Sequence, residues 1–160
     1  MDLNYLAFIL IAFIPLGIGF YWYAPSSVIS KWASAKFKAP SHLGVRQILL
    51  YYLFSLAFVY GYMNLIIHQL GFYELFFTDI MKGSAEAKHI TQEFLAKYGD
   101  KHRHFGHGVF HGVINAVIIA LPFIGVQAIV EGKSIRVVMH HFSYWLVASA
   151  LVGGCISQFV

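Results

Sequence analysis

The chain has 160 residues, short enough for one compact unit. Hydrophobic residues make up 59% of it and charged residues only 11%, against about a quarter in a typical soluble domain. A chain this apolar is not disordered. So few charges cannot cover the surface of a water-soluble protein, and the composition therefore favours a protein surrounded mostly by lipid. The net charge of +4 does not indicate a nucleic-acid partner, because no stripe of basic residues alternates with aromatic ones in a polar context.

Four long apolar segments are predicted to span a membrane, at about 3–23, 47–70, 105–130 and 137–160. A span in lipid must satisfy its own backbone hydrogen bonds, so each is expected to be an α-helix. The fold class is therefore an all-α integral membrane protein, with one domain over residues 1–160 and the four helices in an antiparallel bundle. Pro15 and Pro122 lie inside spans, and a kink is expected near each.

The first loop, residues 24–46, is predicted to face the cytoplasm. It carries four basic residues and no acidic one, and cytoplasmic loops are enriched in Lys and Arg. This orientation places both termini and the long second loop outside. The second loop holds five basic and five acidic residues, which weakens the orientation argument.

Within the second loop, residues 85–98 are predicted to form a short amphipathic helix. Ser84 is a suitable N-cap and Gly99 a suitable stop, and apolar residues recur between them at helical spacing. The helix would either lie on the outer membrane surface or cap the bundle as a solvated helix.

Small residues on the spans predict where helices pack. Gly108 and Gly112 form a Gly-xxx-Gly step on span three, and Ala57 and Gly61 form a similar step on span two. Such steps let helix backbones approach closely in lipid. We therefore expect spans two and three to pack against each other, while small residues on span four favour self-association. Those residues are Ser149 and Gly153.

Polar residues at membrane depth mark the candidate site. If spans two and three run antiparallel, His68 at the outer end of span two comes level with His104 and His107, and Asn64 comes level with about His111. The same face of span three also carries Asn115. The sequence thus predicts a cluster of imidazoles and carboxamides at the outer end of one interface.

Three interpretations of this cluster remain open. The first is that the side chains hydrogen-bond across helices and fix the bundle, and the absence of an accompanying carboxylate or thiolate favours it. The second is a divalent metal site, since His107 and His111 are spaced i and i+4 and His68 could complete the shell. The third is a proton or ion path, and the lack of any ionised residue deep in a span argues against it.

A second polar group is predicted near the cytoplasmic end of span four. There His140, Tyr144 and His141 could meet three residues from other parts of the chain, and ordinary anchoring at the membrane interface is the favoured interpretation. These three are Trp22, Tyr23 and Gln127.

Enzymatic patterns are largely absent from the sequence. There is no converging Ser, His and acid set, no HExxH pattern and no Gly-rich phosphate loop. Cys155 is the single cysteine, which excludes an internal disulfide and a cysteine-based zinc site.

Several short motifs resemble a known family in combination. They are Tyr21-Trp22-Tyr23-Ala24-Pro25, Gly106-His107-Gly108 with His111-Gly112, Leu121-Pro122 followed by Gly125 and Glu131, and Tyr144-Trp145. Over essentially the whole chain they resemble the small bacterial membrane proteins catalogued as domain of unknown function seventeen sixty-one. The resemblance implies a four-span protein of the bacterial inner membrane with no assigned activity, and it supplies no ligand residues.

The leading expectation is therefore a structural or accessory membrane protein that self-associates or joins a larger membrane complex. The alternative is a binder or transporter of a small ligand, metal ion or proton that uses the histidine cluster. Enzymatic action on a lipid or quinone ranks third, because no positioned acid, base or established metal accompanies the spans.

Overall fold

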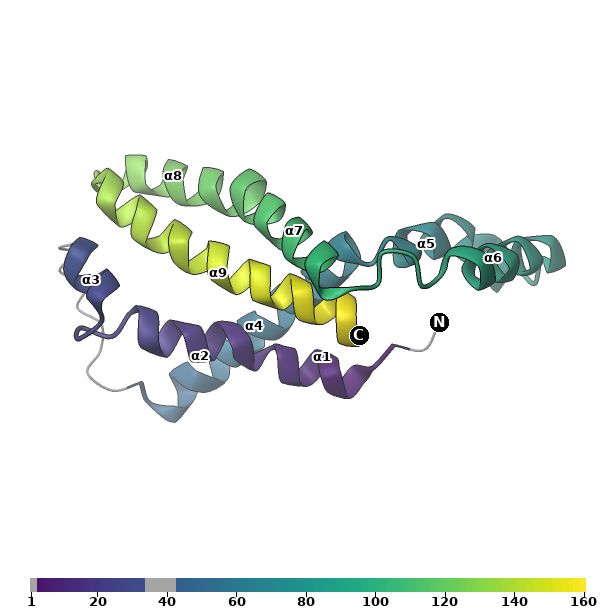
Figure 1. Cartoon of the computed structure of the whole chain (residues 1–160), viewed down its shortest axis with the longest axis horizontal. Coiled ribbons are helices and arrows are strands. Elements are labelled where there is room, and N and C mark those ends of the chain that lie inside the picture. Colours follow the sequence, from purple (N-terminus) through teal and green to yellow (C-terminus); the bar gives the residue numbers. More distant parts are fainter. Residues whose placement is uncertain (1–2, 34–42) are drawn as a thin grey trace.

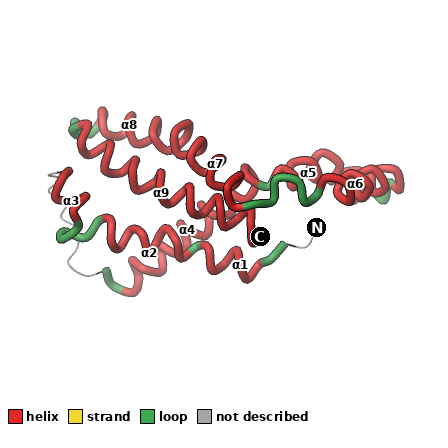
Figure 2. Tube along the Cα trace, in the orientation of Figure 1, coloured by secondary structure: helices red, strands yellow, loops and turns green. Residues whose placement is uncertain are grey.

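A computed structural model describes residues 3–33 and 43–160. Helices make up 83% of this part of the chain and no strand occurs in it, so the all-helical expectation is confirmed (Figure 2). The basic residues Lys36 and Lys38 of the first loop lie outside the described ranges.

Among the described residues, four helical segments are long and apolar enough to cross a membrane: Tyr5–Trp22, Val45–Ile66, Phe105–Val130 and Ile135–Phe159. The chain is thus a multi-pass membrane protein by the length and composition of its helices. The first segment comprises α1 (Tyr5–Ile11) and α2 (Phe13–Trp22), and the second is α4 (Val45–Ile66). The third comprises α7 (Phe105–Asn115), the π-helical turn η1 (Ala116–Ala120) and α8 (Leu121–Val130), and the fourth is α9 (Ile135–Phe159). A short helix, α3 (Val28–Ala33), follows the first segment.

The helical pattern is interrupted shortly before each intramembrane proline. Proline has no N–H, so Pro15 and Pro122 cannot donate to the carbonyls four residues earlier. The first segment breaks after Ile11, which supplies one of those carbonyls. Before Pro122 the chain forms the π-helical turn, where the N–H of Leu121 donates to the carbonyl of Ala116. The expected kink angles themselves stay predictions.

Helix α9 is the element on which the other spans pack (Figure 1). Gly108 and Gly112 of α7 face α9, not α4. A Cβ on Gly108 would come within 2.6 Å of the carbonyl carbon of Gly153, and one on Gly112 within 2.7 Å of that of Ser149. The two backbones are in direct contact, as the Gly-xxx-Gly step requires, but the partner is span four.

The expectation that the small residues of spans two and three meet is therefore wrong. Ala57 and Gly61 are exposed on α4, and a Cβ added to Gly61 would meet no atom within 4 Å. Ser149 and Gly153 are fully buried against α7 and are not free for contact with another chain. A step of small residues permits close approach, but it does not specify the partner helix.

Side-chain contacts give the relative direction of the spans. Tyr51 contacts Tyr144 near the start of both α4 and α9, and Tyr62 contacts Ser149 further along both helices, so α4 and α9 run in the same direction. Between α7 and α9 the contacts proceed in opposite order, since Gly108 meets Gly153 and Gly112 meets Ser149. The apolar core lies where α1, α4 and α9 meet and includes Val59, Ile66, Val152 and Ile156.

Two further helices project from one end of this body, at the right of Figure 1: α5 (His68–Met81) and α6 (Ala85–Tyr98). They fold back on each other through a turn at Gly83, and the rings of Phe72 and Phe94 stack with centroids 3.8 Å apart. The helix at 85–98 is present, and the Ser84 side chain accepts a hydrogen bond from the N–H of Ala87. Helix α5 is not predicted by the sequence analysis, which divides its residues between the end of span two and the second loop.

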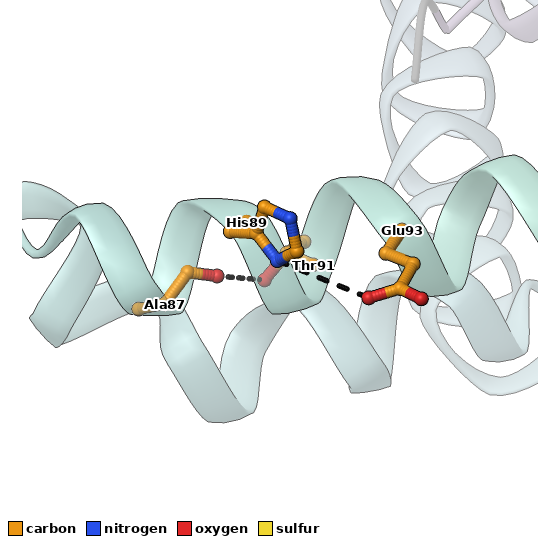
Figure 3. A network of polar contacts seen from close by, with 4 residues as sticks. All are labelled: Ala87, His89, Thr91 and Glu93. Atoms are coloured by element: carbon orange, nitrogen blue, oxygen red, sulfur yellow. Dashed lines mark hydrogen bonds and ion pairs between the residues drawn. The ribbon is translucent and has the colours of Figure 1, made fainter.

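Polar contacts along α6 stay within the helix (Figure 3). The Thr91 hydroxyl donates to the carbonyl of Ala87 at 2.8 Å, and His89 lies 3.8 Å from Glu93. His89 and Glu93 are more than three-quarters exposed, so this pair contributes little to stability. His89 does not belong to the metal-competent histidine group formed in the described part of the chain.

Candidate functional site

The position of His68 follows from a break between α4 and α5. Helix α4 ends at Ile66, and Ile67 takes up an extended conformation with φ −87° and ψ 90°. Ile67 is only 1% exposed, so its side chain anchors the break in the core. His68 is therefore the first residue of α5, next to the end of α4, and it does not lie on the face of a continuous span.

The start of α7 is held by the end of α9. The N–H of Phe105 donates to Oε1 of Gln158 at 3.1 Å, and the Ser157 hydroxyl donates to the carbonyl of His102 at 3.1 Å. Residue 104 caps the same helix, because Nδ1 of His104 accepts from the N–H of His107 at 3.2 Å. The bonds from Phe105 and His107 satisfy N–H groups that a helix start leaves unpaired, and the Ser157 hydroxyl ties the preceding loop to α9.

Three imidazoles converge where these two elements meet. One ring nitrogen from each of His68, His107 and His111 can be chosen so that all three lie within 4.8 Å of one another. The Nε2 atoms of His68 and His107 are 3.4 Å apart. The ring of His111 is centred 4.9 Å from that of His68 and 4.5 Å from that of His107. We call this group the three-histidine site.

The three-histidine site lies at the surface of the helical body. His68 is exposed, and His107 and His111 are half-buried. It contains no carboxylate or thiolate, so neutral imidazoles would be its only protein ligands.

The other predicted members of the cluster have different roles. His104 is the helix cap described above and is not one of the three converging side chains. Asn64 donates from Nδ2 to the carbonyl of Tyr60 on its own helix, so it does not reach His111. Asn115 lies one turn beyond His111, and its buried Nδ2 has no hydrogen-bond partner among the residues described.

Sequence reasoning missed His102, which packs against the site. Its ring stacks on that of His107, with centroids 4.8 Å apart and planes 22° apart. His102 has a φ of 67°, a left-handed conformation that turns the chain sharply before α7. The alternation of histidines at 102 and 104 was the available signal, but nothing in a sequence indicates a left-handed histidine.

Arg103 adds a positive charge close to this loop. Burial lowers the pKa of its guanidinium, and the nearby Asp100 carboxylate opposes that shift. One Nη of Arg103 is buried without a hydrogen-bond partner in the described part of the chain.

The second predicted group does form, around the carbonyl oxygen of Pro15. The hydroxyls of Tyr51 and Tyr144 lie 3.1 and 3.0 Å from this oxygen and 2.5 Å from each other. Each hydroxyl has one proton, so at most two of the three contacts are hydrogen bonds at any moment. Tyr51 was missed because its relation to Tyr144 depends on the packing of α4 against α9.

The remaining members of the second group tie span one to the start of α9. The Trp22 indole N–H donates to the carbonyl of His140 at 3.2 Å, and the Tyr23 hydroxyl lies 3.0 Å from Nδ1 of His141. Gln127 is not part of this group, since its Nε2 donates to Glu131. Burial, and secondarily the nearby Tyr51, raises the pKa of the Tyr23 hydroxyl.

The two groups therefore differ in kind. The second group is buried or half-buried, and its tyrosine hydroxyls and the Trp22 indole contact other side chains or backbone carbonyls, which suits a structural role. The three-histidine site is accessible, and its ring nitrogens converge on a common point. Comparison of the chain with protein-family models, with curated proteins and with solved structures finds no match, so the argument for function depends on this site.

Proposed function

We propose that this protein binds a divalent transition-metal ion, with zinc as the best fit, at the three-histidine site. The observation that carries the proposal is the convergence of ring nitrogens from His68, His107 and His111 within 4.8 Å. Neutral imidazoles are common ligands of zinc, and three of them leave a fourth position open for water or a substrate.

The spacing of the nitrogens suits a metal better than a direct hydrogen bond. A tetrahedral zinc ion with Zn–N distances of about 2.0 to 2.1 Å holds its ligand nitrogens about 3.3 to 3.4 Å apart. The Nε2 atoms of His68 and His107 are 3.4 Å apart, beyond the usual range of a hydrogen bond donated by nitrogen. His111 would need only a side-chain adjustment to reach the same spacing.

The proposal includes the position of the site in the membrane. We place four antiparallel spans in a bacterial inner membrane, with both termini and the three-histidine site outside, on the basis of the basic first loop and the family resemblance. The opposite order of contacts along α7 and α9 supports this arrangement. The spans contain no deep ionised residue that would carry an ion across, so the function is binding at the outer surface.

The test is metal binding by the full chain purified without a histidine tag. Elemental analysis and equilibrium dialysis with zinc should give about one bound ion per chain. His107→Ala and His111→Ala should each weaken binding by at least about tenfold, while His89→Ala, an exposed histidine on α6, should leave it unchanged. Less than about a tenth of an equivalent in the wild type would contradict a metal site. An equal loss in His89→Ala would show that the measured binding is nonspecific.

Self-association is a second candidate, favoured by one observation. Ala57 and Gly61 form a small-residue step that is exposed on α4 and has no partner within the described chain. We propose that two copies meet there, because such steps drive helix association in lipid. Gly61→Leu should convert the particle from dimer to monomer in nanodiscs, while Gly125→Leu, at an open position on α8, should not. A monomeric wild type would refute this candidate.

A further inference from the structure

A separate cavity of about 430 Å³ lies among α1, α4 and α5. It shares no residue with the three-histidine site. Its volume is within the range of about 300 to 1,000 Å³ typical of small-molecule sites. Five of its lining side chains are aromatic: Tyr5, Phe8, Tyr60, Tyr73 and Phe77. We call it the aromatic cavity.

The aromatic cavity carries one acidic side chain, Glu74. None of the described residues that line it is basic. Glu74 forms no ion pair within residues 3–33 and 43–160. The cavity is thus negative at one point and rich in π-electron faces elsewhere, and both features attract a cation.

The rest of the wall is apolar. Leu3, Met63 and Leu70 line the cavity, and Met63 is buried in the core. Tyr60 and Met63 belong to the last two turns of a membrane-spanning helix, while Tyr73 and Glu74 lie on α5 beyond the span. The cavity therefore joins the end of a candidate membrane span to α5, and its one acidic side chain, Glu74, lies on α5 and is exposed.

We propose that the aromatic cavity binds a lipophilic organic cation. The apolar body of such a molecule would lie among Leu3, Met63 and Leu70, and its charge would lie between the aromatic faces and the Glu74 carboxylate. A cation over an aromatic ring gains about 0.5 to 2 kcal/mol, depending on desolvation. A neutral acyl chain would leave Glu74 without a counter-charge, and an anion would be repelled by it. This inference does not depend on the proposed metal site.

The test compares two probes of the same shape and opposite charge, tetraphenylphosphonium and tetraphenylborate. Saturable binding to the full chain is measured in a nonionic detergent, above partition into protein-free micelles. The wild type should bind the cation at least about tenfold more tightly than the anion, which corresponds to about 1.4 kcal/mol. Equal binding of the two probes would overturn the proposal.

Variants on α5 separate charge from shape. Glu74→Gln should weaken binding of tetraphenylphosphonium by about tenfold, while Asp79→Asn, an exposed acid on the same helix outside the cavity, should change it less than about twofold. Tyr73→Leu should weaken binding and Tyr73→Phe should retain it, because the aromatic face matters and the hydroxyl does not. Unchanged binding in Glu74→Gln, or an equal loss in Asp79→Asn, would refute a specific role for Glu74.

The histidine variants keep the two proposals apart. His107→Ala and His111→Ala should bind tetraphenylphosphonium like the wild type, since neither residue lines the aromatic cavity. Zinc binding therefore tests the three-histidine site, and tetraphenylphosphonium binding tests the aromatic cavity. Either proposal can fail without the other.

Discussion

Substitution of Gly112 by alanine tests the packing that holds the three-histidine site together. A Cβ at this position would lie 2.7 Å from the carbonyl carbon of Ser149 and 3.0 Å from Cα of Ala150. Both are backbone atoms of α9, so neither can rotate away. The carbonyl oxygen of Ser149 lies closer still, and ordinary contact begins at 3.4 Å, so the two helices would have to separate by more than 0.7 Å, the difference between 3.4 and 2.7 Å.

The energetic cost of Gly112→Ala depends on how tightly α7 packs on α9. Overpacking a well-packed interior typically costs about 1 to 3 kcal/mol. The higher helix propensity of alanine offsets about 0.5 to 1 kcal/mol of this, so we expect a net loss of up to about 2.5 kcal/mol in the free energy of unfolding. Separation of α7 from α9 would also shift His111, one residue away, and weaken zinc binding.

Titration with sodium dodecyl sulfate from mixed micelles, followed by tryptophan fluorescence, measures this loss. Gly125→Ala is the matched control, because it lies in the same span, outside the proposed contact between copies, and a Cβ there meets no atom within 4 Å. It should be neutral or slightly stabilising. An equal or larger loss for Gly125→Ala than for Gly112→Ala would refute the packing of α7 on α9.

Three further predictions concern single side chains. Tyr144→Phe should lower the free energy of unfolding by about 1 kcal/mol, because it removes a buried hydroxyl from the Pro15 carbonyl, and a double-mutant cycle with Tyr51→Phe should show coupling. Gln158→Ala should weaken zinc binding without removing a ligand, because it frees the N–H of Phe105 at the start of α7, whereas Gln127→Ala should not. Tyr23 has a raised pKa in the folded state, so the unfolded chain loses the proton first and stability should fall as the pH rises above about 10. Tyr23→Phe should reduce that fall in a stability measurement from pH 8 to 11, and an unchanged slope would exclude Tyr23 as its source.

Some of the site was predictable because one helix contains it. His107 and His111 are spaced i and i+4, so their proximity follows from helix geometry alone. His68 reaches them from another helix, and its position depends on the break at Ile67. No glycine or proline at this break predicts it from the sequence. His104 belongs to the same run of histidines, but it is the N-cap residue of α7, and its ring accepts a backbone hydrogen bond there.

The sequence by itself determined that the chain has four membrane-spanning helices. Lipid selects for apolar length and for internal backbone hydrogen bonds, and both are local properties that each segment shows on its own. Only the tertiary structure decided which helix faces meet. Gly108 and Gly112 permit close approach by any helix. They pack on α9 because Ser149 and Gly153 are also small and lie opposite Gly112 and Gly108 along the contact. Partner choice depends on the shape of two surfaces at once, and that is settled only when the spans are assembled.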